Sequence, residues 1–266
     1  MFSQYKQEVT KYTKKDAVIA LCFYTYACIV LFLFGMLSRL PNLPIGGTVL
    51  HIMSTTLVAG ALFAIIILKK QGAASIGIHM RNLKPALLLG LLFSVFILLQ
   101  NAFLPAFIED WEPHSLSNIM LMLFYAVTIS FMEDTMCTGY IQTRIYGLIK
   151  NDIIAVLVAA FLFAFIHVPW LAGFSGVSAF SSLVSLSMMV WIGSHIIWNL
   201  VFRRYFSLFP IMMMHIAWNM GNDGIFITNG GSFINNFNLA ALILAVVIWL
   251  IIVRRKAQKT SVERIQ

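Results

Sequence analysis

A small set of polar side chains interrupts stretches of this sequence that are otherwise apolar. Carboxylate, imidazole and carboxamide groups are the types that carry acid–base chemistry and stabilise developing oxyanions. Inside a membrane-spanning helix each is costly unless it is paired or functional, so these residues are the first candidates for a site. They are Glu133, Asp134, His167, His195, Asn199, His215 and Asn219, with His51 and Asn101 nearer the ends of their apolar stretches.

The two acids, Glu133 and Asp134, are neighbours in the middle of an apolar stretch. Neighbouring residues on an α-helix point about 100° apart, so we expect these carboxyl groups to serve different partners. The alternative interpretation is a buried hydrogen-bonding pair that only fixes helix packing.

Two pairs of histidine and asparagine have the spacing of one helix turn. His215 and Asn219 are four residues apart, so on a helix they share a face and can converge on one bound group. His195 and Asn199 repeat this spacing one apolar stretch earlier. Spacing alone does not choose between the pairs.

Depth along the predicted helices tests whether three of the candidates can meet. At a rise of about 1.5 Å per residue, Glu133, His167 and His215 lie about 16, 22 and 16 Å from the same side of the membrane. They therefore fall in a similar layer, which favours one site. Taken alone, His167 has another interpretation, a hydrogen bond to a backbone carbonyl freed by Pro169.

Membrane-spanning helices are the elements that must position these residues. The chain has 266 residues, of which 60% are hydrophobic and 11% charged, and a soluble domain of this length could not bury so much apolar surface. A span takes about 20 apolar residues, and only helices satisfy their backbone groups in lipid. We predict an all-α, polytopic transmembrane bundle with spans at about 17–38, 48–68, 85–105, 118–143, 152–171, 178–202, 206–221 and 236–253.

The basic residues alternate with these predicted spans. Of the 18 Lys and Arg residues, 17 fall on one side, and only Arg39 falls opposite. The positive-inside rule then places both termini in the cytoplasm. The formal net charge of +8 is explained by topology and by attraction to anionic lipid, so nucleic acid is not an expected partner. We expect a multi-pass protein of the cell membrane, most consistent with a bacterial plasma membrane.

The sequence reads as a single transmembrane domain over residues 1–266. Cys22, Cys28 and Cys137 lie in predicted spans without metal-ligand spacing, and we interpret them as small packing residues. There is no glycine-rich phosphate loop and no long linker. We therefore expect neither a cofactor nor a metal.

The order of the motifs resembles that of the CAAX protease and bacteriocin-processing family, also called the Abi family of intramembrane peptidases. Its pattern is EExxxR on one helix, then FxxxH, then HxxxN on a later helix. The similar segments here are Glu133–Asp134, Phe163–His167 and Pro210–Asn219, with a further likeness upstream at Ser75–Ile78. The resemblance extends over about residues 70–220 and implies a catalytic core there.

The resemblance implies a role for each catalytic candidate. Glu133 matches the base that activates water, and His167 matches the residue that helps to position water or substrate. His215 and Asn219 match the oxyanion-stabilising pair, because the family's pair follows a proline, here Pro210. The implied activity is a metal-independent endopeptidase whose peptide or membrane-protein substrate arrives from the cytoplasmic side or laterally.

The sequence departs from the family pattern at two linked positions. Asp134 replaces the second glutamate, and Thr138 stands where the family has arginine. Asp134 must then be protonated, bonded to Thr138 or paired elsewhere, and we expect both residues, with Phe163, to support the site. Two alternatives stay open: a degenerate member that acts by binding, in bacteriocin self-immunity or membrane signalling, and a zinc protease using the same residues. The substrate and the oligomeric state stay open as well.

Overall fold

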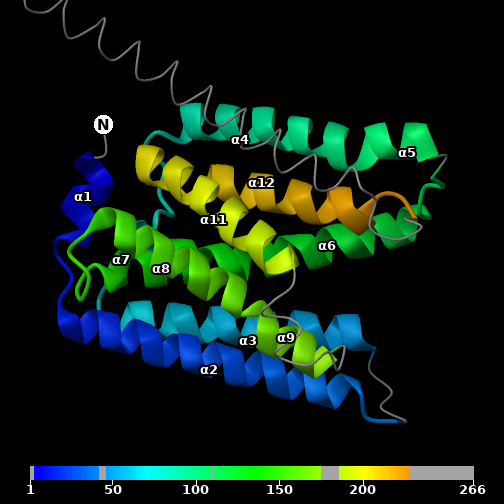
Figure 1. The fold of residues 1–266 in the computed structure, drawn as a ribbon. Coiled ribbons are helices and arrows are strands. Elements are labelled where there is room, and N and C mark those ends of the chain that lie inside the picture. The colour runs from blue at the N-terminus through cyan, green and yellow to red at the C-terminus, as the bar shows by residue number, and fades with distance from the viewer. Residues whose placement is uncertain (1–2, 42–45, 110, 175–185, 228–266) are drawn as a thin grey trace, which may run out of the picture.

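The computed structural model describes residues 3–41, 46–109, 111–174 and 186–227, and the regular elements in these ranges are helical (Figure 1). Within the same ranges, the one isolated β-bridge joins Pro113 and Phe226. The predicted all-α fold class is therefore confirmed.

Five helical stretches among the described residues are long and apolar enough to cross a membrane. They agree with the first five predicted spans to within a few residues: Lys14–Ser38, Gly47–Leu68, Leu83–Glu109, Leu116–Ile145 and Asp152–Phe174. Helices α11 (Leu186–Tyr205) and α12 (Phe209–Asn219) overlap the sixth and seventh predicted spans. The eighth, at 236–253, lies outside the described residues. The count of eight and the cytoplasmic termini stay predictions.

Several of these stretches change helix type along their length. The first two are α2 (Lys14–Ser38) and α3 (Gly47–Leu68). The third joins α4 (Leu83–Leu98), the π-helical η2 (Leu99–Phe103) and α5 (Leu104–Glu109). The fourth joins α6 (Leu116–Glu133), the π-helical η3 (Asp134–Ile141) and α7 (Gln142–Ile145). The fifth joins α8 (Asp152–Phe165) and α9 (His167–Phe174).

Shorter elements complete the described chain. They are α1 (Ser3–Val9), the 3₁₀ turn η1 (Ala73–Ile76) and the π-helical η4 (Met220–Gly224). The π segments η3 and η4 begin directly after Glu133 and Asn219. Single π turns inside α-helices recur at functional sites, so both interruptions mark the region of the candidate residues.

Helix-start residues fix where the site helices begin. The Ser115 hydroxyl accepts a hydrogen bond from the Asn118 backbone N–H at 3.4 Å and caps α6. The Asn151 side chain accepts from the backbone N–H of Ile153 at 2.9 Å and caps α8. Pro210 lies in the first turn of α12, where its missing N–H costs nothing.

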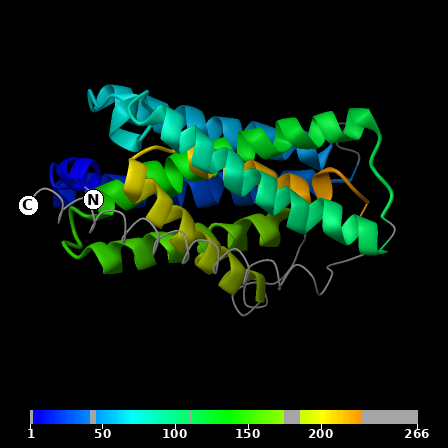
Figure 2. The same cartoon turned by 90° about the horizontal axis from the view of Figure 1, so that it is seen from above.

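The axes of the long helices are roughly aligned, and α11 crosses them at an angle (Figures 1 and 2). Helix α12 packs against α4 and α6, α9 packs against α2, and α11 packs against α8. Two glycines allow the close approach of α9 to α2. A Cβ atom at Gly173 would lie 2.8 Å from the Phe32 carbonyl oxygen and 3.0 Å from Gly35 Cα. This contact holds α9, which carries His167, against the bundle.

One end of the bundle contains α1, α7 and the loop 69–82, and we name it the basic end (Figure 1). Arg144 is at this end, but it is fully buried and does not lie in a loop as the count of basic residues assumed. Its guanidinium donates to the Ser75 carbonyl oxygen at 3.0 Å and hydroxyl at 2.8 Å, and it lies 4.3 Å from the ring centre of Tyr12 and 4.5 Å from that of Tyr140. It thereby ties η1 to α7.

Candidate active site

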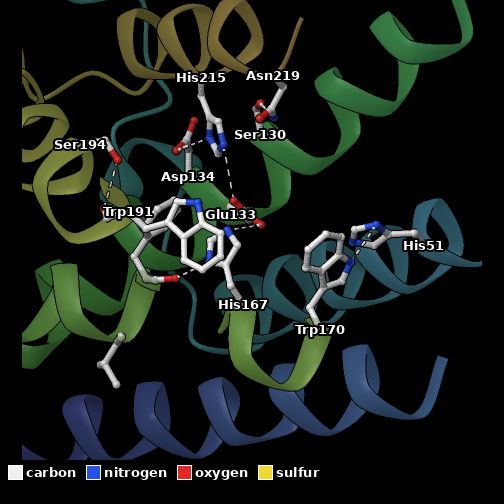
Figure 3. Close-up of polar contacts among 12 residues, drawn as sticks. His51, Ser130, Glu133, Asp134, His167, Trp170, Trp191, Ser194, His215 and Asn219 are labelled. Atoms are coloured by element: carbon white, nitrogen blue, oxygen red, sulfur yellow. Dashed lines mark hydrogen bonds and ion pairs between the residues drawn. The ribbon is translucent and has the colours of Figure 1, made fainter. Parts of the chain in front are cut away.

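The Glu133 carboxylate faces two imidazole rings (Figure 3). Its Oε1 atom lies 4.0 Å from His167 Nε2, and its Oε2 atom lies 3.5 Å from His215 Nε2. Helices α6, α9 and α12 supply these three residues, so the structure brings together the groups that the depth argument placed in one layer. Their side chains are 10%, 14% and 6% exposed, respectively, which leaves the Glu133 carboxylate accessible to a small molecule.

Asp134 binds the other nitrogen of the same ring, with its Oδ1 atom 3.2 Å from His215 Nδ1. The expectation that the two acids serve different partners is therefore wrong. Asp134 begins the π segment η3, whose wider turns contain more residues than an α turn, so neighbouring side chains diverge less. Asp134 is fully buried, and the Thr138 hydroxyl has no hydrogen-bond partner among the described residues. Of the three options for Asp134, pairing elsewhere is the one observed.

His167 lies where α8 meets α9, and its ring is held by a backbone group of α8. Its Nδ1 atom lies 3.0 Å from the Phe163 carbonyl oxygen. A carbonyl can only accept, so Nδ1 donates, and in a neutral ring the Nε2 atom facing Glu133 carries a lone pair. The backbone bond expected for an isolated histidine is thus present together with the contact to Glu133. Its partner is the Phe163 carbonyl and not one freed by Pro169.

Asn219 lies one turn after His215 on α12. Its Nδ2 atom donates to the Ser130 hydroxyl at a distance of 3.4 Å, which is long for a hydrogen bond. Ser130 is fully buried and lies three residues before Glu133 on α6. Ser130 is not among the candidates predicted from the sequence, although its helical spacing from Glu133 places both residues on one face.

Aromatic rings surround the two imidazoles. Trp191 stacks on His167 with ring centres 4.0 Å apart, and Trp198 contacts His215 at 4.6 Å. Phe163 makes T-shaped contacts with both histidines, with ring centres 5.3 Å from His167 and 6.0 Å from His215. The two tryptophans were also missed, and their spacing of seven residues on α11 was the available signal.

His195 and Asn199 are not part of this polar cluster. The His195 ring stacks on Phe163 with centres 4.3 Å apart and planes 13° apart. Both residues are fully buried. The two ring nitrogens of His195 and the amide oxygen and nitrogen of Asn199 have no hydrogen-bond partner in the described ranges. The matching spacing therefore does not bring this pair to Glu133.

A cavity of about 400 Å³ has the candidate residues at one end, and Glu133, His167, His215 and Asn219 all line it. From there it extends back along α6 as far as Met122, past Trp170 of α9 and His51 of α3, away from the basic end. On the other side of Glu133, η3 and α7 are buried throughout. We expected a substrate to arrive from the cytoplasmic side or laterally. The cavity extends away from the basic end, which is the end that the positive-inside rule predicts to be cytoplasmic.

The fold and this cluster define a class: a polytopic helical protein with a carboxylate and imidazoles at one end of a cavity between its helices. Among the described residues, no group of three or more His, Cys, Asp or Glu side chains is arranged so that it could hold a metal ion.

The comparison with protein families gives a match over residues 115–221. The matching family is described as type II CAAX prenyl endopeptidase Rce1-like. The resemblance to the CAAX protease family is therefore confirmed, and the chain is similar to a family of proteases. All four catalytic candidates lie within the matched range, whereas Ser75–Ile78 lies outside it. Neither the curated proteins nor the solved structures gave a match.

Proposed function

We propose that this protein is an intramembrane endopeptidase in which Glu133 activates water to hydrolyse a peptide bond. The observation that carries the proposal is the Glu133 carboxylate at one end of a cavity, within 4.0 Å of one imidazole and 3.5 Å of another. Substrates are peptides or membrane proteins, since the family described as Rce1-like is one of endopeptidases.

Glu133 and His167 together can hold the attacking water. The Glu133 oxygen and the His167 lone pair are both acceptors, and at 4.0 Å they do not bond each other directly. A water molecule between them can donate one O–H to each. Glu133 then takes one of these protons as the water oxygen attacks the substrate carbonyl, which is general-base catalysis.

His215 and Asn219 can stabilise the oxyanion that this attack creates. The His215 imidazole lies within 3.5 Å of two carboxylates, and their negative charges favour its protonated form. In that form both ring nitrogens carry an N–H. Asp134 then acts as a positioning residue, because it holds the Nδ1–H and leaves Nε2–H for the oxyanion. The Asn219 amide supplies a second donor. Transfer of the proton from Glu133 to the leaving nitrogen gives a carboxylic acid and an amine.

The direction of the cavity bears on how the substrate enters. The cavity extends away from the basic end, and in the orientation expected from the positive-inside rule this is the extracytoplasmic side. We therefore propose entry from that side or laterally through the bilayer, in place of entry from the cytoplasm.

The test compares cells that carry the wild type with cells that carry Glu133→Gln at equal membrane abundance. Membrane proteomes and released peptides should show intact substrate accumulating in the variant and its cleavage products disappearing. An undiminished set of products from Glu133→Gln would end the peptidase proposal and favour a family member that acts by binding, for example in bacteriocin self-immunity.

A further inference from the structure

His51, near the start of α3, lines the cavity away from Glu133 (Figure 3). Its ring is buried and is packed by three aromatic rings, with centres 4.9 Å from Phe174, 5.2 Å from Tyr125 and 5.3 Å from Trp170. These contacts hold the imidazole in one orientation beside the cavity.

The hydrogen bonds of this ring identify which nitrogen carries the proton. Trp170 Nε1 lies 3.1 Å from His51 Nδ1, and the Tyr125 hydroxyl lies 2.6 Å from the same atom. An indole N–H can only donate, so His51 Nδ1 must be an acceptor. The proton of the neutral ring is then on Nε2. For this Nε2–H donor, no acceptor is found within hydrogen-bond distance among the described residues.

A preorganised N–H donor beside a substrate cavity needs an acceptor from the ligand. The cavity's described lining residues include no lysine or arginine, and the charge of a protonated His215 is already offset by Glu133 and Asp134. A free carboxylate bound there would therefore lack a compensating cation. A neutral carbonyl oxygen meets no such penalty. We propose that His51 Nε2–H binds a backbone carbonyl of the substrate and thereby helps to select the cleavage position, an inference that rests on the peptidase function proposed above.

The position of this carbonyl follows from the length of α6. Tyr125, which contacts His51, precedes Glu133 by eight residues, or about 12 Å of helix. An extended peptide advances about 3.3 Å per residue. The carbonyl bound by His51 is therefore three or four residues from the bond that Glu133 attacks.

The experiment uses the full-length protein in lipid nanodiscs and a pool of synthetic random-sequence dodecapeptides with amidated C-termini. A cleaved member is resynthesised with each carbonyl oxygen replaced in turn by sulfur, a weaker acceptor. In the wild type, one replacement three or four residues from the cleaved bond should raise KM roughly tenfold, the effect of one neutral hydrogen bond. His51→Phe, which keeps an aromatic ring, should raise KM about as much with little change in kcat, and should be insensitive to that replacement.

His79→Phe is the matched control, since His79 lies in the loop at the basic end and does not line the cavity. Cleavage by His51→Phe with unchanged KM and an unchanged sulfur pattern would overturn the role of His51 and leave the peptidase proposal standing. If no peptide is cleaved, the peptidase proposal fails, and binding of the same pool to Glu133→Gln decides the role of His51. Equal binding, or no binding, with and without His51→Phe then overturns it.

Discussion

Two pairs of histidine and asparagine with the same spacing have opposite surroundings in this protein. His215 on α12 lies within 3.5 Å of two carboxylates, and Asn219 reaches a buried hydroxyl. His195 on α11 is stacked on Phe163, and neither it nor Asn199 has a hydrogen-bond partner among the described residues. The imidazole rings of both histidines are nevertheless buried and contact the same phenylalanine.

This difference shows that the spacing of a motif does not make a reactive site. Both pairs present an imidazole and an amide on one helix face, but only one of them faces the helix that carries the acids. A base is needed to generate a nucleophile from water, and the carboxylate of Glu133 is the group at this site that can supply it. The following predictions change the two pairs so that they become more or less alike.

Removing the base should have the largest effect. Glu133→Gln keeps the size of the side chain but removes its basicity, so the His215 pair would lose the carboxylate that can activate water and would keep only Asp134. Turnover should fall by about 10²-fold or more. Single-turnover cleavage measured in nanodiscs at matched protein concentration checks this, and the exposed Glu112→Gln is the control.

The two histidines should respond differently to the same substitution. His215→Gln removes the Nε2–H donor beside the oxyanion and should lower kcat by about 10²-fold. His195→Gln should keep a substantial part of the activity, because its ring contacts no reacting group. Equal inactivation of both variants at equal membrane abundance would show that we assigned the catalytic role to the wrong pair.

The sequence allowed the spans and the main candidates to be predicted because both depend on local patterns. Apolar length gives the first five spans, and polar residues in lipid are rare enough to identify Glu133 and His215. The contact of both Glu133 and Asp134 with the His215 ring depends on a π turn, and no residue type in η3 predicts such a turn. The burial of Arg144 and the packing of His51 by three aromatic rings depend on contacts between distant segments. The pattern of apolar residues along the chain does not predict such contacts.

A smaller effect should follow from changing Asp134. Asp134→Asn retains an acceptor for His215 Nδ1–H but removes the charge that favours the protonated ring. The loss of one charge-assisted hydrogen bond should lower kcat by about tenfold, with KM nearly unchanged. The pH profile separates this role from packing. Activity of the variant should decline at a lower pH than that of the wild type, because a neutral partner holds the His215 proton less strongly.

The smallest effect is expected from removing metal ions. The proposed chemistry assigns Glu133 and His167 to water activation and His215 to the oxyanion, so each group uses its own proton or lone pair and none is reserved for an ion. Dialysis of the protein in nanodiscs against a strong chelator should leave kcat unchanged within about twofold, well below the effect of any side-chain change above.

If the zinc alternative were correct, metal content would also show which of the two histidine pairs contributes a ligand. One carboxylate and two imidazoles would be a plausible zinc set, and in that case activity would vanish on chelation and return with one equivalent of zinc. Metal content by mass spectrometry must accompany the assay, because a tightly held ion could survive dialysis. Stoichiometric zinc in active protein that is lost from His215→Gln and kept by His195→Gln would replace the water-activation scheme with a metal-dependent one.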